Sequence, residues 1–580
     1  MEMAGPTAPK DPEKARPFFY ILKDKDIFGE RQKDGTGIQF IYESDGRLIN
    51  SAQITGNVTD KEELRLLETV EGFGRLVHSI GVSVETDRPE ETAEFVFQMY
   101  GKKDLYGGGT NLTTSLKCDG MEHRIYLSDY RWTEDDHVPG QIKILFAAPE
   151  RMGKVSVRLF LNDGYEAPPE EEDLVIDMHS EEYCGMISRS LLQLGNPYRI
   201  RKAIEKSKAG KEVTLAYIGG SITQGAGAIP IHTECYAYKS FQLFQNRFST
   251  QNNVRFIKAG VGGTPSELGM IRFDRDVLRE GERPDIVVIE FAVNDEGDET
   301  KGVCYESLVR KVLKLPWKPA VVLLFSVFAN DWNLQERLRP VGDLYDLPMV
   351  SIRDAVTPQF SLKCGEGRIL SKNQFFYDIF HPNNTGHTIM ADCLQYLFER
   401  CDAAEPARVG TFVEGMTEEQ ILSEKLSGPA VIGADFERIF LLDKKNRYVG
   451  AKIRAGSFTS TDIELQSVEM DGNLTQTPEF PYNWMYDGSR PQMPGFEMEI
   501  TCKSLFLIFK DSGEMDVGKA NVFVNDVYCM TADPHKNNWL HCNAVLLFWE
   551  TESRSHKVRI AVTEEDRNKK FTILGFGYTI

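Results

Sequence analysis

Five strongly apolar segments in the middle of the chain constrain its fold more than any other feature. Nearly every side chain in them is apolar, which is typical of strands buried on both faces of a sheet. Amphipathic stretches at residues 266–279, 305–315 and 384–400 predict helices between and after them. This alternation predicts an α/β fold, an α/β/α sandwich with a parallel five-stranded sheet. The five segments are 214–219, 254–260, 286–293, 320–328 and 347–352.

The regions on either side show a different pattern. From about residue 18 to 161, short apolar or alternating runs such as GIQFIYE and AEFVFQMY follow one another, with turn residues between them. This pattern predicts a β-sandwich. Runs such as SLFLIFK and AVLLFWE predict a second one after a charged joint at 401–408. We therefore expect three domains: a jelly-roll-like β-sandwich at 1–184, the α/β domain at 185–408 and a C-terminal β-sandwich at 409–580.

Charge and hydropathy argue against several kinds of partner. Lys and Arg number 67 against 87 Asp and Glu, a formal net charge of −20, and the basic residues form no large cluster. Such a chain repels phosphates, so we expect no nucleic-acid partner. No apolar run approaches the length of a membrane span, and the N-terminus lacks the basic start and apolar stretch of a signal peptide. The ten cysteines are scattered, without zinc-site spacing. We expect a cytoplasmic protein without a membrane or metal partner.

Ser221 directly follows the first apolar segment, in the run Gly219-Gly220-Ser221-Ile222-Thr223. Ligands bind at the carboxyl ends of the strands in parallel sheets. A serine at such an end, opening a helix, exposes its hydroxyl beside N–H groups that favour developing negative charge. The same position also suits an ordinary helix N-cap. Taken alone, Ser221 leaves both interpretations open.

Three further segments supply the partners of an acyl-transfer site. The second apolar segment ends in Gly260-Val261-Gly262-Gly263-Thr264, where missing side chains let a backbone N–H approach a substrate oxygen closely. Asn294 follows the third segment, and its amide can donate to an oxyanion. Asp378 precedes His381 by three residues, so its carboxylate can accept from Nδ1–H and leave Nε2 free to take the serine proton. The order of these pieces favours catalysis over coincidence.

This ordered set resembles the SGNH hydrolase superfamily, also called GDSL-like esterases, whose four blocks contribute Ser, Gly, Asn and His. The resemblance implies a flavodoxin-like hydrolase domain at 185–408, with Ser221 as nucleophile, His381 as base and Asp378 as its partner. One block departs from the family name, because GGSIT replaces GDSL and Gly220 stands where Asp is usual.

The resemblance also assigns an oxyanion hole and a substrate class. The oxyanion donors it implies are the N–H groups of Ser221 and Gly263, with Gly262 as the alternative glycine, and the Asn294 side chain. The blocks are similar to those of carbohydrate esterases from bacteria that degrade plant polysaccharides. They imply removal of O-acetyl groups from mannan or xylan, as polysaccharide or oligosaccharide, without a cofactor. Two other functions stay open: a lipid or thioester acylhydrolase of the same superfamily, and a non-catalytic carbohydrate-binding protein.

Aromatic residues in and near the C-terminal domain add candidates for sugar binding. Phe480, Tyr482, Trp484 and Tyr486 alternate, so an extended segment would place their rings on one face. That face is either the core of a strand or a sugar-stacking platform in a carbohydrate-binding-like domain. Trp539 lies in a polar stretch, and Trp332 follows the fourth apolar segment, where it can line the cleft. The substrate-binding candidates are Trp332, Trp484, Tyr486 and Trp539.

Overall fold

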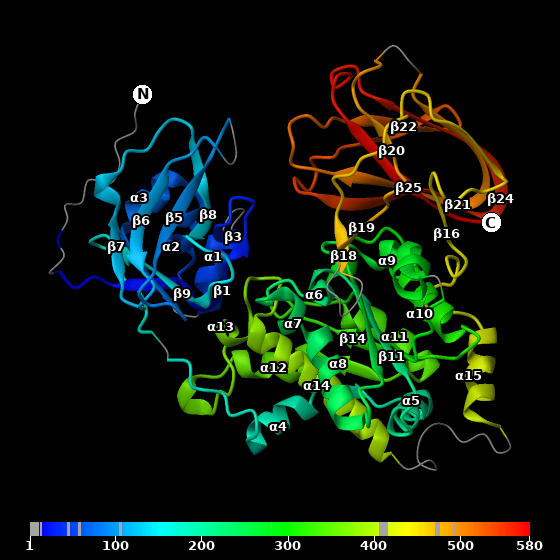
Figure 1. Cartoon of the computed structure of the whole chain (residues 1–580), viewed down its shortest axis with the longest axis horizontal. Coiled ribbons are helices and arrows are strands. Elements are labelled where there is room, and N and C mark those ends of the chain that lie inside the picture. The colour runs from blue at the N-terminus through cyan, green and yellow to red at the C-terminus, as the bar shows by residue number, and fades with distance from the viewer. Residues whose placement is uncertain are drawn as a thin grey trace.

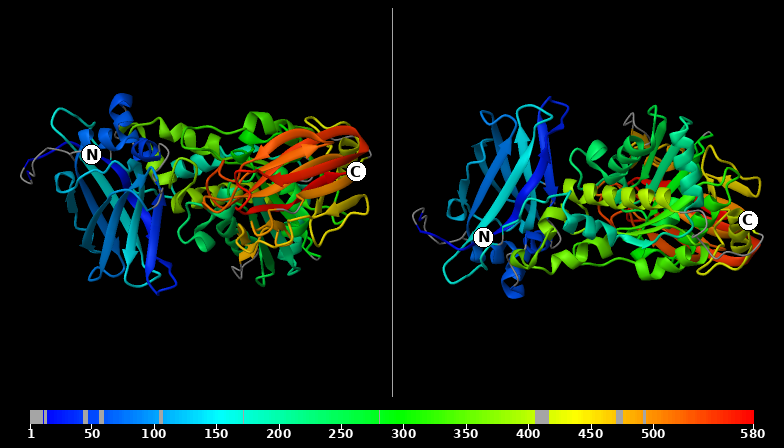
Figure 2. Two further views of the ribbon diagram at one scale, coloured as in Figure 1. Left: turned by 90° about the horizontal axis from the view of Figure 1, so that it is seen from above. Right: turned by 90° about the horizontal axis from the view of Figure 1, so that it is seen from below.

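The computed structural model of the chain shows three lobes (Figure 1). The N-terminal lobe and the C-terminal lobe both contact the central lobe, and the views from above and below separate the two flanking lobes clearly (Figure 2). The structure describes the whole chain except residues 1–10, 12–13, 43–46, 56–59, 104–106, 171, 280, 405–415, 470–475 and 492–493.

The N-terminal lobe consists of two antiparallel sheets that enclose one core. The sheet orders are β1-β9-β4-β7 and β2-β3-β8-β5-β6. Buried side chains from both sheets, such as Val82 of β4 and Phe97 of β5, belong to a single apolar cluster, so the lobe is a β-sandwich. Its elements are β1 (Phe18–Phe28), β2 (Glu30–Arg31), β3 (Gly37–Tyr42), α1 (Arg47–Thr55), α2 (Lys61–Arg65), α3 (Val70–Leu76), β4 (Val77–Thr86), β5 (Thr92–Gly101), β6 (Asn111–Lys117), β7 (His123–Tyr126), β8 (Asp136–Phe146) and β9 (Met152–Leu161).

The central lobe is an α/β/α sandwich around one sheet of order β10-β15-β14-β13-β11-β12. The strands from β11 to β15 pair in parallel and correspond to the five predicted segments, whereas β10 pairs antiparallel to β15 at the edge. The expected five-stranded sheet is therefore corrected to a mixed six-stranded one, because β10 has only three residues and carries no strand pattern of its own. The strands are β10 (Leu191–Gln193), β11 (Val213–Gly219), β12 (Val254–Gly260), β13 (Ile286–Glu290), β14 (Ala320–Phe325) and β15 (Met349–Ser351).

Alternate residues of these strands face two helical layers. In β11, for example, Leu215 packs in one apolar cluster with α5, α8 and α14, whereas Ala216 packs in another with α9, α10 and α11. The predicted helix at 266–279 is α9 followed by one π turn at Asp274–Leu278. The helices are α4 (Glu181–Ser188), α5 (Tyr198–Lys208), α6 (Ser221–Gln224), α7 (Ile231–Glu234), α8 (Tyr236–Phe248), α9 (Ser266–Phe273), α10 (Val303–Leu313), α11 (Gln335–Tyr345), α12 (Ile352–Phe360), α13 (Lys372–Phe375) and α14 (Asn384–Ala403).

The C-terminal lobe is built around two long strands, β21 and β24, which pair with each other along most of their length. A register shift between Cys502 and Ser504 interrupts that pairing; beyond it β21 pairs with β25, and before it with β17. A bulge at this point lets the long strands bend, so that β21 pairs with β17 in one half of the lobe and with β25 in the other. The helix α15 (Glu418–Ser427) precedes this lobe and lies against α11 of the central lobe. The strands of the C-terminal lobe are β16 (Phe440–Leu442), β17 (Ala451–Arg454), β18 (Ser467–Glu469), β19 (Gln476–Pro478), β20 (Trp484–Tyr486), β21 (Phe496–Asp511), β22 (Ala520–Val524), β23 (Val527–Ala532), β24 (His541–Val562) and β25 (Phe571–Thr579).

Both flanking lobes pack against the central lobe. Buried C-terminal residues such as Phe506 and Leu574 belong to the same apolar cluster as Leu268 of α9, so one core crosses this boundary. The N-terminal lobe uses both apolar and polar contacts: Ile54 of α1 lies in the same apolar cluster as Leu215, and the Lys25 ammonium donates to the Phe376 carbonyl. The Asn373 amide also donates to Lys23 O at 3.3 Å. Phe376 lies just before Asp378, so this contact reaches the loop that carries His381.

Candidate active site

Ser221 stands at the carboxyl end of β11, where the chain turns directly into α6. The turn is crowded: a Cβ on Gly219 would lie 2.1 Å from Thr223 Oγ1, and one on Gly220 would lie 2.1 Å from Asn294 Oδ1. Contacts this short exclude any side chain without movement of the neighbours. The two glycines therefore let the strand end, the helix and the Asn294 loop approach one another around Ser221.

Three side chains form a hydrogen-bonded chain at this edge. His381 Nε2 lies 2.9 Å from Ser221 Oγ, and His381 Nδ1 lies 2.9 Å from Asp378 Oδ2. The Asp378 carboxylate is itself fixed, because Oδ1 accepts from the backbone N–H groups of Phe380 and His381 at 2.8 and 2.9 Å. The structure thus brings together the nucleophile, base and carboxylate that the sequence suggested, in the geometry of an activated serine.

The glycine turn lies beside Ser221. A Cβ on Gly262 would lie 3.9 Å from Ser221 Cβ, whereas a Cβ on Gly263 would meet Trp539 and His541 of the C-terminal lobe. Gly263 has φ of +70°, a conformation that favours glycine. Asn294 begins a short turn after β13, and its side chain packs on Gly220 next to Ser221. The glycine turn and Asn294, two candidate sources of oxyanion donors, therefore lie close to Ser221.

Arg272 ties the starts of two of these loops together. Its buried guanidinium donates to Gly219 O at 2.8 Å, at the end of β11, and to Ala259 O at 2.7 Å, near the end of β12. It also pairs with Asp276 at 2.9 Å. A fixed fork of donors suits two neighbouring carbonyls. Sequence reasoning missed Arg272, since an arginine within an amphipathic helix gives no sign that it points inward.

Buried titratable groups lie behind Ser221. Glu290, at the end of β13, accepts from Thr223 Oγ1 at 3.2 Å, and burial raises its pKa to about 7. His387 accepts from Tyr236 N at 3.1 Å through Nδ1 and donates to Ala226 O through Nε2. Burial lowers the pKa of His387 to about 3, so its ring is neutral and supports the loop after α6.

Two of the aromatic candidates lie near the triad. Trp332 stacks on Phe328 with ring centroids 5.8 Å apart; Phe328 contacts Phe380 at 5.1 Å, and Phe380 contacts His381 at 6.1 Å. A line of rings thus leads from Trp332 to the base. Trp539, 44% exposed, reaches the site from the C-terminal lobe and covers Gly263.

The other two aromatic candidates are corrected by the structure. Trp484 and Tyr486 are only 5% and 4% exposed. They lie on β20, which pairs with β25, and their rings contact Phe496 and Phe458 inside the C-terminal core. A buried ring is unavailable to a sugar, so Trp484 and Tyr486 belong to a core strand and not to a stacking platform, whereas Tyr482, before the strand, is 44% exposed.

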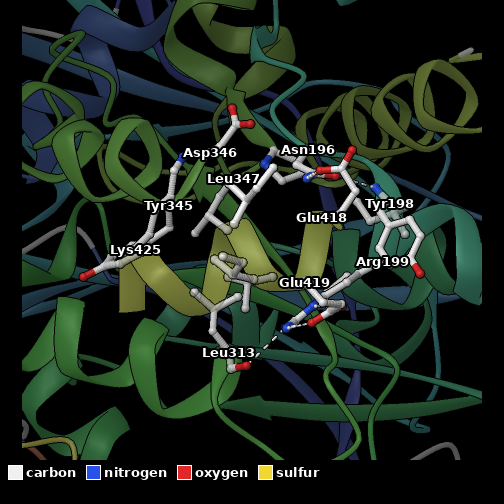
Figure 3. A pocket seen from close by; sticks show the side chains of 16 residues that line it. Asn196, Tyr198, Arg199, Leu313, Tyr345, Asp346, Leu347, Glu418, Glu419 and Lys425 are labelled. Atoms are coloured by element: carbon white, nitrogen blue, oxygen red, sulfur yellow. Dashed lines mark hydrogen bonds and ion pairs between the residues drawn. The ribbon is translucent and has the colours of Figure 1, made fainter. Parts of the chain in front are cut away.

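A small cavity lies at the opposite end of the sheet (Figure 3). Its walls come from α5, α11, α15 and the amino-terminal starts of β14 and β15, and its volume is about 40 Å³, room for a few water molecules. Two of its charged groups pair with each other, since Arg199 donates to Glu419 at 2.9 Å. Because the cavity lies at the amino-terminal ends of the strands and Ser221 at the carboxyl end of β11, the two sites are separate.

Other kinds of site find no support in the residues that the structure describes. Those residues include no group of three or more His, Cys, Asp or Glu side chains suited to holding a metal ion. Within the same ranges, every helix is too short or too polar to span a bilayer.

The comparisons with known proteins agree with this geometry. Residues 217–389, which contain Ser221, Asn294, Asp378 and His381, match the model of the GDSL-like lipase/acylhydrolase family. The central lobe is a GDSL-like hydrolase domain. No curated protein matches the chain significantly.

Solved structures resemble the chain over more than that domain. The crystal structure of a two-domain esterase (CEX) active on acetylated mannans has a TM-score of 0.54 and 23% identity, over 68% of this chain and 98% of that one. The structure of the esterase co-crystallised with mannopentaose has a TM-score of 0.53 and 24% identity, again over 68% of this chain and 98% of that one. An acetylxylan esterase from Geobacillus stearothermophilus aligns with 34% of this chain and 97% of its own, at 19% identity and a TM-score of 0.26. The first two show a shared fold.

Proposed function

We propose that the chain is a serine esterase that removes O-acetyl groups from hemicellulose polysaccharides or oligosaccharides. The observation that carries the proposal is the chain of 2.9 Å contacts from Ser221 Oγ through His381 to Asp378, within the residues that match the hydrolase family. A hydroxyl, an imidazole and a carboxylate in this order make a nucleophile at neutral pH without a metal.

The reaction we propose proceeds through an acyl-enzyme. His381 Nε2 takes the proton from Ser221 as Oγ attacks the ester carbonyl, and Asp378 stabilises the imidazolium through Nδ1. Three donors would hold the oxyanion: the Asn294 side-chain amide, the N–H of Gly263 and that of Ser221, which as the first residue of α6 has no acceptor within the helix. His381 then gives the proton to the sugar oxygen as the bond between that oxygen and the carbonyl carbon breaks, and the sugar leaves with a free hydroxyl. Water attacks the acetyl group in the second half by the same route.

An acetylated mannan or xylan is the substrate class we favour. A structural neighbour that shares the fold over 68% of this chain is described as a two-domain esterase active on acetylated mannans. Exposed indole at Trp539 and the ring line from Trp332 to His381 offer flat apolar surfaces beside the triad, and such surfaces suit sugar rings. In this proposal the C-terminal β-sandwich contacts the substrate through Trp539.

Ser221→Ala tests the proposal most directly. Removing the nucleophile eliminates covalent catalysis, and losses of about 10⁴-fold or more in kcat are typical. Activity should be measured side by side on acetylated mannan, acetylated xylan, p-nitrophenyl acetate and a long-chain p-nitrophenyl ester. We expect the acetylated glycans and the short ester to be hydrolysed by the wild type alone. Preference for the long-chain ester would indicate a lipid acylhydrolase instead, and unchanged turnover by Ser221→Ala would contradict the mechanism.

A further inference from the structure

The glycine turn after β12 is held from outside its own domain. The turn spans Val261 to Thr264: Thr264 N donates to Val261 O at 3.4 Å, and Thr264 Oγ1 donates to the same oxygen at 2.8 Å. Its third residue, Gly263, has a positive φ of +70°. The central peptide of such a turn can face either of two ways, and two adjacent glycines impose little steric preference between them. Something else must choose the orientation.

Gln466, just before β18 of the C-terminal lobe, contacts the central peptide. Its Nε2 donates to Gly262 O at 2.9 Å, and its Oε1 accepts from Cys542 N at 3.0 Å. The side chain is 9% exposed. The C=O and N–H of a trans peptide point in opposite directions, so holding Gly262 O also fixes the direction of the Gly263 N–H. That N–H is the oxyanion donor of the proposed mechanism.

His541, the first residue of β24, holds the next peptide. Its Nε2 lies 3.0 Å from Gly263 O, and because a carbonyl only accepts, Nε2 carries the proton. Its Nδ1 lies 3.2 Å from Asp511 Oδ2, and Asp511 is fully buried. With the proton on Nε2, Nδ1 accepts from the Asn537 amide at 3.2 Å, and the same amide also donates to Asp511 Oδ2, so this polar group fixes the orientation of the ring. Both peptides on either side of Gly263 are therefore bound by the C-terminal lobe.

We propose that Gln466 and His541 are positioning residues for the oxyanion hole. They fix the peptides on either side of Gly263, so that its N–H faces the oxygen that becomes negative during attack by Ser221. The proposal rests on the proposed esterase function. It gives the C-terminal lobe a part in the chemistry itself, on small esters as much as on glycans, apart from any contact with sugar. Pre-organised donors cost no reorganisation as the charge develops, so loosening them should lower kcat.

Substitutions can remove the donors with little change of shape. Gln466→Glu keeps the acceptor for Cys542 N but places an oxygen against Gly262 O. His541→Leu removes the donor to Gly263 O, whereas His541→Gln keeps a donor, because the amide nitrogen of Gln can reach the Nε2 position. His556→Leu is the matched control: this histidine lies on the same strand, is 5% exposed like His541, and contacts Asn525 instead of the turn.

Two measurements separate positioning from general destabilisation. For hydrolysis of p-nitrophenyl acetate, we expect kcat to fall about 10- to 100-fold in Gln466→Glu and His541→Leu, with KM within about 3-fold of wild type, since displacement of a reacting group by about 1 Å can cost about 10²-fold. His541→Gln should recover most of this loss, and His556→Leu should leave kcat near wild type. Hydrogen exchange of amides 261–264 should quicken in the first two variants.

The proposal is overturned if Gln466→Glu and His541→Leu keep kcat within about 3-fold of wild type, if His556→Leu loses as much as they do, or if the exchange of amides 261–264 is unchanged. Failure of the esterase function would look different, because Ser221→Ala would then turn over like the wild type. Hydrogen exchange reports whether Gln466 and His541 hold the turn, whether or not the protein is an esterase.

Discussion

At the scale of single residues, the site depends on a side chain that is absent. Gly220 leaves the space in which Asn294 lies, since a Cβ there would come within 2.1 Å of Asn294 Oδ1 and 2.6 Å of Nδ2. The departure from GDSL to GGSIT therefore has a consequence for the proposed oxyanion hole. In this chain the second position of the block makes room for the asparagine of the third block.

Asn294→Ala should lower kcat on p-nitrophenyl acetate by about 10² to 10³ and leave KM little changed, because an oxyanion donor acts mainly in the transition state. Steady-state kinetics of the purified variant measure both constants. A rise in KM alone would assign Asn294 to substrate binding instead.

Gly220→Ala should lower kcat through the same asparagine, by displacing its amide. A double-mutant cycle tests this coupling: added to Asn294→Ala, the alanine at 220 should cost much less than it does alone. Thermal unfolding of each variant controls for misfolding. Additive losses would mean that Gly220 serves the backbone of Ser221 and not the asparagine.

Glu290 predicts a pH-dependent stability. Its pKa rises from 4.5 to about 7 on burial, so between these values the folded chain binds the proton and the unfolded chain does not. Stability from this group is complete below about pH 4.5 and is lost as the pH rises through about 7. The shift corresponds to about 3 kcal/mol. Glu290→Gln, which stays neutral, should lose less stability than wild type between pH 5 and pH 8, as measured by denaturant unfolding. If the stability of wild type and of Glu290→Gln changed equally with pH, Glu290 would not titrate in this range.

At the scale of secondary-structure elements, the sequence predicted those parts whose cause is local. The five parallel strands were found because strands buried on both faces are apolar throughout. Ser221, Gly263 and Asn294 were singled out because they follow three of those strands, and Asp378 and His381 because of their spacing. Predicted strand ends were less accurate: the segment at 286–293 yields β13 at Ile286–Glu290, since the chain turns early to place Asn294. The segment from Phe480 to Tyr486 left core and platform equally open, because alternating aromatic residues satisfy both until a partner strand is known.

Trp539, in the loop before β24, and Trp484, in the core strand β20, allow a matched pair of predictions. Trp539→Ala removes a 44% exposed ring beside Gly263. We expect kcat/KM on acetylated oligosaccharide to fall about 5- to 150-fold, or about 1 to 3 kcal/mol, with p-nitrophenyl acetate near wild type, because binding energy remote from the ester is available only to the longer substrate.

Trp484→Ala is the contrast, since its ring lies in the core. It should cost about 3 to 5 kcal/mol of unfolding free energy and reduce both activities together. Kinetics on the two substrates and a thermal melt distinguish the two variants. Equal losses on both substrates for Trp539→Ala, with a lower Tm, would make Trp539 a structural residue as well.

At the scale of the whole molecule, the contacts that complete the site are those that sequence could not reveal. Gln466 and His541 follow Gly262 by about 200 residues or more, and no local pattern links a glutamine before one strand to a glycine turn in another domain. The same holds for the core that joins Leu268 to Phe506. Side chains at such a boundary are apolar, like those of any domain core. The sequence therefore indicates that they are buried but not which residues they pack against.

This shared core leads to the last prediction. A protease site introduced within 405–415, which lies outside the described residues, allows the chain to be cut between the hydrolase domain and the C-terminal lobe after folding. Separation would expose the buried side chains that the two lobes share, among them Phe480, Ile508 and Leu574, and apolar burial of this kind stabilises by about 25 cal/mol per Å². We expect the two fragments to co-elute in gel filtration and to keep most of the p-nitrophenyl acetate activity. The uncut insertion variant is the control. If instead the fragments part and the larger one remains active alone, the C-terminal lobe contributes neither to the core nor to the oxyanion hole.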